Sequence, residues 1–242
     1  MTVPAIFKNM RLPIIGSPLF IVSQPELVIA QCKAGIVGSF PALNARPTSL
    51  LDEWLDQITS ELDSYNRANP DRPAAPFAVN QIVHKSNDRL DHDVEMCVKY
   101  KVPFVITSLG AREEVNQAIH SYGGIVMHDI INVVFAHKAL EKGADGLIAV
   151  CAGAGGHAGK LSPFALIHGI REFFDGPLAL SGSIANGGAV AAAQAMGADF
   201  AYMGSAFIAC DEAVADDGYK NMIVDSAAKD IVYSNLFTGV HG

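Results

Sequence analysis

Eight short apolar segments recur along the chain, and they constrain the fold more than any other feature of the sequence. They are residues 12–19, 35–41, 76–82, 103–109, 124–129, 145–151, 177–183 and 200–205. The segments between them have the apolar spacing of amphipathic helices. Strands that are apolar along their whole length, alternating with such helices, are typical of a parallel sheet buried on both faces. The sequence therefore predicts an α/β fold, a closed (β/α)8 TIM barrel, with an open doubly wound sheet as the alternative.

Two stretches of the chain, residues 139–146 and 194–200, resemble each other. Each contains the end of a predicted helix, then a Gly-Ala-Asp sequence, with the aspartate opening the next strand. Gly143 and Gly197 fit the left-handed backbone position that commonly closes a helix. The same structural unit is thus used at least twice, which favours the barrel.

Composition limits the classes of protein and of partner. A chain of 242 residues fits one barrel of about 250 residues. The net charge of −8, with no run of basic residues, argues against a nucleic-acid partner. The four cysteines lie far apart and form no C-x-x-C pair, which favours free thiols and a cytoplasmic location. No signal peptide is expected, and glycines and polar residues interrupt the long uncharged stretch 176–198, so no membrane partner is expected either. A homo-oligomer is left open.

The loops after the last two predicted strands have the composition of a phosphate site. Ser181, Gly182 and Ser183 end the seventh strand, and Gly204 and Ser205 end the eighth. Glycine lets an anion approach the main chain closely, while hydroxyls and backbone N–H groups bind it. Tight turns that need glycine are the alternative. Two such loops on neighbouring strands favour a phosphate site.

Other candidate residues stand at the ends of earlier strands. His157 lies on a loop after the sixth strand whose neighbours are almost all glycine and alanine, so it has no apolar face to fill. This favours a catalytic or ligand-facing role. His128 and Asp129 end the fifth strand, which leaves a functional role open, and Asn80 lies near the end of the third, where its amide suits a planar heterocycle. The histidines show no metal-ligand spacing, so no metal site is predicted.

Together these segments resemble the nitronate monooxygenase family, formerly called 2-nitropropane dioxygenases. The resemblance runs from Leu12 to about Cys210. It rests on the strand-one segment Ser17, Pro18 and Leu19, and on residues 77–80, 155–159, 181–183, 197–199 and 203–205. Members of this family are barrels that bind FMN, and their relatives include flavin-dependent enoyl-acyl-carrier-protein reductases and NADH:quinone reductases.

The resemblance implies a role for each matching residue. Ser17, Pro18, Leu19 and Asn80 would line the flavin ring. Gly182, Ser183, Gly204 and Ser205 would hold the phosphate, with Ser181 and His128 completing the cofactor site. Gly155 and Gly156 would pass close to the flavin, and His157 would be the catalytic histidine.

The chain also departs from the family pattern. Several relatives have a lysine at the end of strand five, where this chain has Asp129, and many have an arginine where it has Ala206. Both changes remove positive charge near the expected phosphate and nucleotide contacts. Residues 1–210 are expected to form the barrel and residues 211–242 the start of a helical lid, which is either reduced or cut short.

The function expected from this resemblance is FMN-dependent oxidation of an alkyl nitronate by molecular oxygen, giving a carbonyl compound and nitrite. The alternative on the same scaffold is an NAD(P)H-dependent reductase of an enone, enoyl thioester or quinone. A third reading comes from the phosphate loops alone. They would also suit a cofactor-free phosphate-sugar isomerase or a phosphate-binding protein without catalysis.

Overall fold

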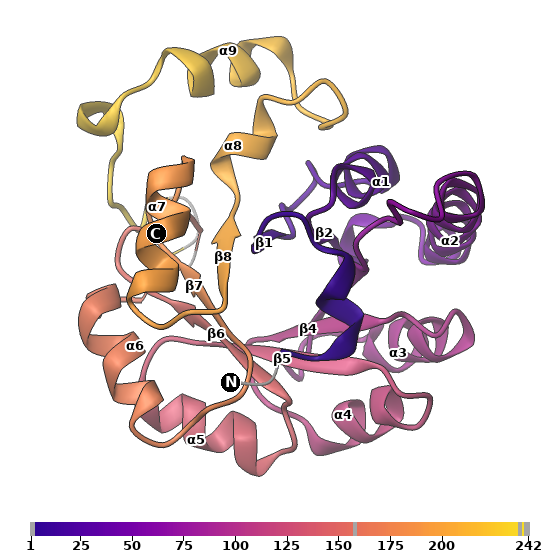
Figure 1. Ribbon diagram of the computed structural model, residues 1–242, viewed down its shortest axis with the longest axis horizontal. Helices are drawn as coiled ribbons and strands as arrows, with labels where there is room; N and C mark the ends of the chain where they lie inside the picture. Colours follow the sequence, from indigo (N-terminus) through magenta and orange to yellow (C-terminus); the bar gives the residue numbers. More distant parts are fainter. Residues whose placement is uncertain (1–2, 157–158, 237–238, 240–242) are drawn as a thin grey trace.

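Eight parallel strands form the centre of the molecule in a computed structural model that describes residues 3–156, 159–236 and 239 (Figure 1). The strands are β1 Ile14–Gly16, β2 Gly38–Pro41, β3 Phe77–Ile82, β4 Phe104–Ser108, β5 Ile125–Ile130, β6 Gly146–Val150, β7 Leu178–Ser181 and β8 Phe200–Met203. Each strand from β2 to β7 pairs with the next in the sequence, and β8 pairs with β1.

The sheet closes on itself between β1 and the segment leading into β2. The Gly16 N–H donates to the Val37 carbonyl (2.8 Å), and the Val37 N–H donates to the Ile14 carbonyl (3.0 Å). Closure confirms the TIM barrel, and the doubly wound alternative was wrong. The predicted strands all occur, although most are shorter than the apolar segments that predicted them.

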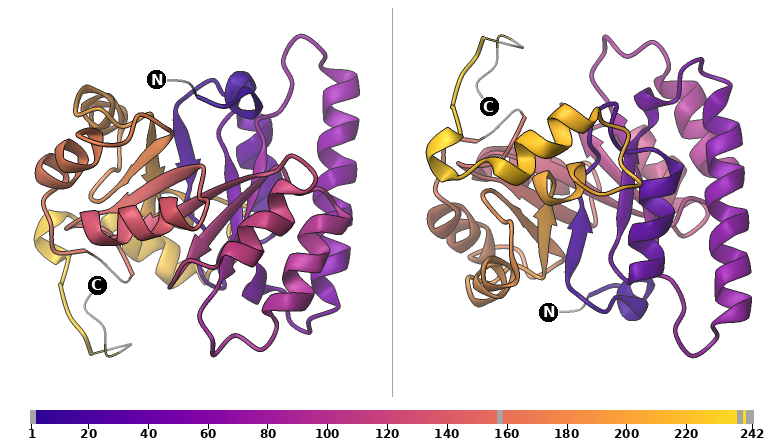
Figure 2. Two further views of the ribbon diagram at one scale, coloured as in Figure 1. Left: turned by 90° about the horizontal axis from the view of Figure 1, so that it is seen from below. Right: turned by 90° about the horizontal axis from the view of Figure 1, so that it is seen from above.

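Helices surround the strands on the outside (Figures 1 and 2). They are α1 Pro25–Ala34, α2 Leu50–Ala68, α3 Leu90–Lys99, α4 Glu113–His120, α5 Val133–Glu141, α6 Pro163–Arg171 and α7 Gly187–Ala195, followed by the short α8 Ser205–Ile208 and by α9 Asp217–Asp225. Three short 3-10 helices complete the described chain: η1 Ala5–Asn9, η2 Ala42–Asn44 and η3 Ala228–Asp230.

The repeated Gly-Ala-Asp units have a structural role. Gly143 and Gly197 have positive φ angles of 89° and 107°, as expected for residues that close helices. The aspartates that follow link neighbouring strands, because Asp145 accepts the Val126 N–H (2.8 Å) and Asp199 accepts the Leu178 N–H (2.9 Å). The repeat therefore belongs to the barrel framework.

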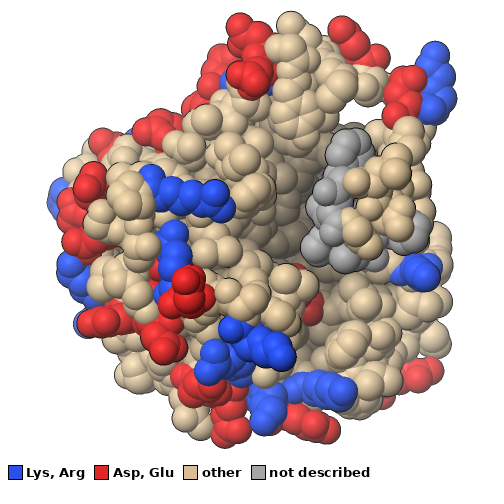
Figure 3. Space-filling model, turned by 180° about the vertical axis from the view of Figure 1, so that it is seen from behind, with Lys and Arg blue, Asp and Glu red and all other residues tan. Residues whose placement is uncertain are grey.

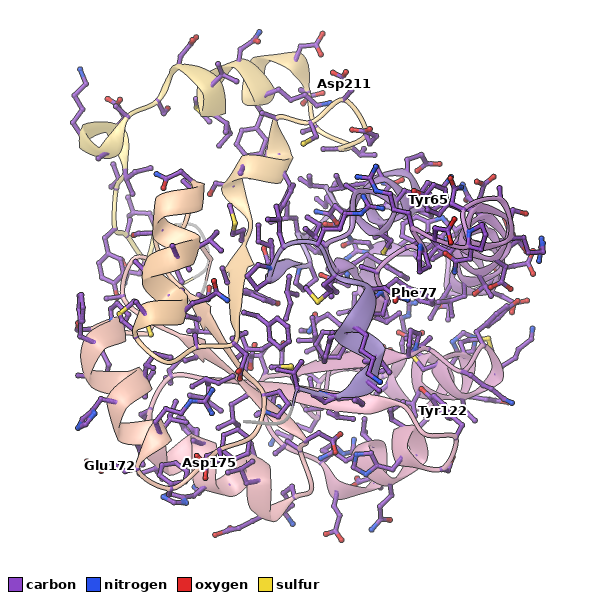
Figure 4. All side chains as sticks on the ribbon, in the orientation of Figure 1. Tyr65, Phe77, Tyr122, Glu172, Asp175 and Asp211 are labelled. Atoms are coloured by element: carbon purple, nitrogen blue, oxygen red, sulfur yellow. The ribbon has the colours of Figure 1, made fainter. Side chains whose placement is uncertain are left out.

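Two apolar layers stabilise the barrel (Figure 4). Inside it lie Ile15, Val37, Ala78, Phe104, Ile106, Met127, Ile148, Ala179 and Phe200. Phe7 of η1 plugs the N-terminal end, with ring centroids 5.5 Å from Phe104 and 4.9 Å from Phe200. The outer layer packs the sheet against the helices and includes Tyr65 and Tyr122, which Figure 4 labels. Aromatic side chains therefore fill the N-terminal end of the barrel interior.

Residues beyond Cys210 pack loosely against that end. Neither α9 nor η3 has a buried residue, and α9 lies beyond α8 at the edge of the molecule (Figure 1). Ile223 packs against a small cluster around Val22 and Ile208, and the Lys220 ammonium donates to the Cys210 carbonyl (2.8 Å). The assignment of 211–242 as a lid stays a prediction. In the described residues, no helix is both long enough and apolar enough to span a bilayer.

Candidate active site

The C-terminal end of the barrel is hollowed (Figure 3). In TIM barrels this end carries the active site, because the loops after the strands converge there. A second cavity, between η1, α2 and the starts of β3 and β4, lies at the opposite end of the barrel. That end is where structural features of a TIM barrel are usually found. We therefore take the hollow at the C-terminal end as the candidate active site.

The floor of the hollow is polar, and strand alternation explains why. Side chains two residues apart on a strand face the same side of the sheet. The interior residues Ala78, Ile106, Met127 and Phe200 are therefore followed, two positions later, by Asn80, Ser108, Asp129 and Tyr202. We call these last four residues the polar layer. It separates the apolar barrel interior from the hollow above.

Hydrogen bonds connect three members of the polar layer. The Asn80 amide donates to the Ser108 hydroxyl (2.7 Å) and to the Ile106 carbonyl (3.3 Å). The Ser108 hydroxyl and the Leu109 N–H in turn donate to the Asp129 carboxylate. Asn80, which was predicted as a flavin contact, is thus fixed in place by its neighbours. A fixed amide suits the binding of a planar ring.

Burial dominates the ionisation of the polar layer. It raises the pKa of Asp129 to about 6, against the smaller opposing effect of the hydrogen bonds from Ser108 and Leu109. Burial also raises the pKa of Tyr202 well above its usual value, with a further contribution from the nearby Asp129 charge. Tyr202 is therefore neutral at ordinary pH, and Asp129 is the group in this layer that titrates near neutrality.

His128 lies on the other face of β5. Its neighbours in the strand, Met127 and Asp129, point into the barrel, so its own side chain points outward. There His128 Nδ1 lies 2.7 Å from the Thr107 hydroxyl, and burial lowers the pKa of His128 to about 4. The structure does not bring His128 to the hollow with the other predicted residues. As a neutral, buried histidine it contributes to the packing between sheet and helices.

The strand-one segment lies directly against the end of β8. The Ser17 N–H donates to the Met203 carbonyl (2.7 Å). A Cβ atom added to Gly204 would lie 2.7 Å from the Ser17 hydroxyl and 3.2 Å from a methyl group of Leu19. The structure thus brings together Ser17, Leu19 and Gly204, which the resemblance assigns to the ring and to the phosphate. A side chain at position 204 would have to displace the Ser17 hydroxyl.

The loops after β6 and β7 are also joined. Ser183 has a positive φ of 53° and donates its N–H to the Gly153 carbonyl (2.9 Å), and its hydroxyl lies 3.2 Å from the same oxygen. The Ser181 carbonyl accepts the Cys151 N–H (2.9 Å). The Ser183 N–H is therefore already bound to the β6 loop. A phosphate in this arrangement would depend more on Gly182 and on the donors after β8 than on the Ser183 N–H.

Open space and unhindered donors lie beside these loops. Within the part of the chain that the structure describes, no atom beyond the chain neighbours and the backbone of α7 lies within 4 Å of a Cβ built at Gly155, Gly156 or Gly187. The Asn186 side chain caps α7 by accepting the Ala189 N–H (3.0 Å), and the exposed Ser205 begins α8. Backbone N–H groups at such helix starts bind anions. These features fit a phosphate placed between the ends of β7 and β8.

The prediction for His157 remains open. His157 lies outside the described residues, so its predicted catalytic role is untested. The described residues contain no group of three or more His, Cys, Asp or Glu side chains that could hold a metal ion. All four cysteines are free thiols, three of them buried.

Sequence reasoning missed part of the polar layer. Ser108 and Tyr202 were not singled out, and Asp129 was noted at the end of the fifth strand and as a departure from the family pattern, with no role assigned. The signal that would have found them is the period-two alternation on β4, β5 and β8. Counting two positions onward from the apolar residues of the barrel interior leads to each of them.

Comparisons with known proteins decide the family. The family model described as nitronate monooxygenase matches residues 5–241. The chain belongs to the nitronate monooxygenase family. A nitronate monooxygenase of Paraburkholderia phytofirmans is 28% identical over 94% of this chain and 71% of its own length. A probable nitronate monooxygenase of Bacillus subtilis is 25% identical over 94% of this chain and 74% of its own length. Membership of the family makes the chain a flavin-dependent oxidoreductase by class.

Solved structures share the fold. FabK from Thermotoga maritima is 26% identical, with a TM-score of 0.82 over 97% of this chain and 71% of that one. Nitroalkane oxidase from Streptomyces ansochromogenes is 23% identical, with a TM-score of 0.85 over 99% of this chain and 78% of that one.

A carboxyl-CoA dehydrogenase of Rhodococcus jostii, a relative by sequence, is 24% identical, and this chain spans only 61% of it. The chain is thus shorter than each of these relatives.

Proposed function

We propose that this protein oxidises alkyl nitronates with molecular oxygen, giving a carbonyl compound and nitrite. The observation that carries the proposal is the match of the nitronate monooxygenase family model to residues 5–241. The hollow at the C-terminal end of the barrel supports it, because a polar floor and glycine-rich walls stand where a flavin and a small substrate would bind (Figure 3).

We propose FMN as the cofactor. The donors after β7 and β8 suit one terminal phosphate, and no G-x-G-x-x-G dinucleotide sequence follows the first strand. Gly182, Gly204 and Ser205 would hold that phosphate. Ser17, Pro18, Leu19 and Asn80 would line the ring, with Gly155 and Gly156 leaving space beside it. FMN would supply the redox chemistry, accepting electrons from the nitronate and passing them to oxygen.

The protein's own contribution is to bind, orient and exchange protons. Asn80, fixed by its bond to Ser108, would orient a planar group above the polar layer. His157, on the glycine loop after β6, would take the α-proton of a neutral nitroalkane, because an unperturbed imidazole with a pKa of about 6.5 suits proton transfer at neutral pH. A nitronate has already lost this proton and does not need the histidine for that step.

Product analysis tests the proposed reaction. The protein loaded with FMN and incubated in air with ethylnitronate should release acetaldehyde and nitrite in equal amounts while consuming oxygen. The same protein without FMN provides the control. Absence of nitrite from a fully loaded sample, with ethylnitronate and with propyl-2-nitronate, would contradict the proposed function.

A second candidate is an NAD(P)H-dependent reductase of an enone, enoyl thioester or quinone. The observation that favours it is the likeness to FabK, at 26% identity and a TM-score of 0.82. Both functions would use the same cofactor and the same end of the barrel. They differ in the electron donor, which a spectroscopic experiment identifies.

A further inference from the structure

Asp129 occupies an unusual position for a carboxylate. It is the last inward-facing residue of β5, two positions after Met127 of the barrel interior, and it is half-buried. The Ser108 hydroxyl and the Leu109 N–H donate to it from the neighbouring strand end. Both donors fix the carboxyl in the polar layer. A titratable group is therefore held at the floor of the space assigned to the ligands.

The groups around Asp129 leave its charge without a counterion. From β4 it faces the neutral Ser108, from β3 the neutral Asn80 beyond it, and from β8 the neutral Tyr202. His128, its neighbour in sequence, points away and stays neutral because its pKa is lowered to about 4. Among the described residues, no charged side chain contributes to the shift of Asp129, which burial raises to a pKa of about 6. His157, beyond β6, lies outside the described residues and is controlled for below.

We propose that Asp129 controls the binding of anions in the hollow: its protonated carboxyl admits and hydrogen-bonds a planar oxyanion, and its ionised carboxylate repels it. This inference rests on the proposed function, in which the substrate is an anion carrying a nitro-type group. It makes Asp129 a residue that sets affinity for the nitronate.

The proposed control of anion binding depends on the proton of the Asp129 carboxyl group. A carboxylic acid donates one hydrogen bond, whereas a carboxylate only accepts, so the ionised form offers nothing to the oxygens of an anion. Two negative charges a few ångströms apart also repel strongly where water is largely excluded. Anion affinity should therefore fall as the pH rises through the pKa of Asp129. If only the protonated form binds, a single group with a pKa of about 6 gives a fall of roughly 25-fold between about pH 5.5 and pH 7.5.

The experiment measures binding of nitrate to the FMN-loaded protein. Nitrate is planar and stays ionised throughout this pH range, so its own protonation does not interfere. Binding is followed by the change in flavin absorbance and by calorimetry. We expect the roughly 25-fold fall in the parent and a flat profile in Asp129→Asn, which should bind nitrate more tightly than the parent at pH 7.5. The neutral 2-methyl-2-nitropropane, which has no α-proton, should show no pH dependence in either protein.

An unperturbed imidazole has a pKa of about 6.5 and favours anion binding when protonated, so His157 needs its own control. In the His157→Ala background the fall in nitrate affinity should persist, and adding Asp129→Asn should abolish it. A profile that is already flat in His157→Ala, or one that is still steep in Asp129→Asn, overturns the proposal. So does a parent that binds no nitrate at any pH.

A second measurement needs no ligand. The pKa of Asp129 is higher in the folded protein than its ordinary value of 3.8, so the folded state binds this proton more tightly. The free energy of unfolding of the cofactor-free parent should therefore fall between pH 3.8 and about 6, relative to that of Asp129→Asn. Ser108→Ala removes a hydrogen bond that lowers the pKa, so it should move the midpoint to higher pH. No difference between the parent and Asp129→Asn contradicts the proposal even if nitrate binding cannot be measured in the variant.

The proposed function and this inference can fail separately. A protein that oxidises no nitronate but binds nitrate with the Asp129-dependent profile refutes the function and retains the control of anion binding. A protein that oxidises nitronates, with nitrate affinity independent of Asp129, refutes the inference alone.

Discussion

His157→Ala is expected to retain FMN and to lose most turnover of neutral nitroalkanes, while turnover of preformed nitronates falls much less. A neutral nitroalkane must give up its α-proton before it can donate electrons, and His157 is the residue proposed to accept that proton. A general base typically contributes about 10²- to 10⁴-fold to the rate. The measurement compares kcat/KM for nitroethane and ethylnitronate in the parent and the variant at equal flavin content.

The control for this variant is His137→Ala. His137 lies on the outside of the barrel, where its ring stacks on Phe173 with centroids 4.0 Å apart. Its loss should leave both activities unchanged. If His157→Ala lowers both activities by the same factor while FMN remains bound, His157 orients or stabilises the nitronate, and its assignment as a base is wrong.

Gly204→Val is expected to abolish retention of FMN. Even the first side-chain carbon at this position would lie 2.7 Å from the Ser17 hydroxyl and 3.2 Å from Leu19. Valine would therefore separate the strand-one segment from the end of β8 and block close approach of a phosphate to the main chain. The measurement is the flavin released by heat from folded protein, identified by chromatography as FMN in the parent and largely absent from the variant.

Gly218→Val is the matched control, because Gly218 is exposed on α9 and no described atom beyond its chain neighbours and the α9 backbone lies within 4 Å of an added Cβ. It should bind as much FMN as the parent. Gly197→Val introduces the same side chain at a helix end with a φ of 107° and should mainly lower stability. Equal FMN occupancy in Gly204→Val and the parent would remove this residue from the phosphate site. Release of FAD from the parent would contradict the choice of cofactor.

The fold could be predicted because its signal is repeated many times. Each strand is short and apolar, each is followed by a helical pattern, and the Gly-Ala-Asp unit marks the same junction twice. Strand ends were harder to place, since a continuous apolar run does not show where pairing stops. Residues 12–19, for example, contain a strand of only three residues.

The site was predicted less completely than the fold, and β5 shows why. His128 and Asp129 are adjacent, and a shift of one residue moves a side chain to the other face of the sheet. His128 was predicted as a cofactor contact because of its chemistry. Alternation from Met127, however, places Asp129 in the polar layer and His128 outside it. The hydrogen bond between Asn80 and Ser108 joins two strands, and nothing local in the sequence specifies it.

The electron donor distinguishes a nitronate monooxygenase from a reductase on the same scaffold. The FMN-loaded protein is mixed without oxygen with ethylnitronate, and separately with NADH and with NADPH, while the flavin spectrum is recorded. If the protein oxidises nitronates as proposed, we expect rapid loss of the oxidised flavin spectrum with ethylnitronate and little change with either nicotinamide nucleotide. Rapid reduction by NADH or NADPH, with none by the nitronate, would contradict it and identify the protein as a reductase.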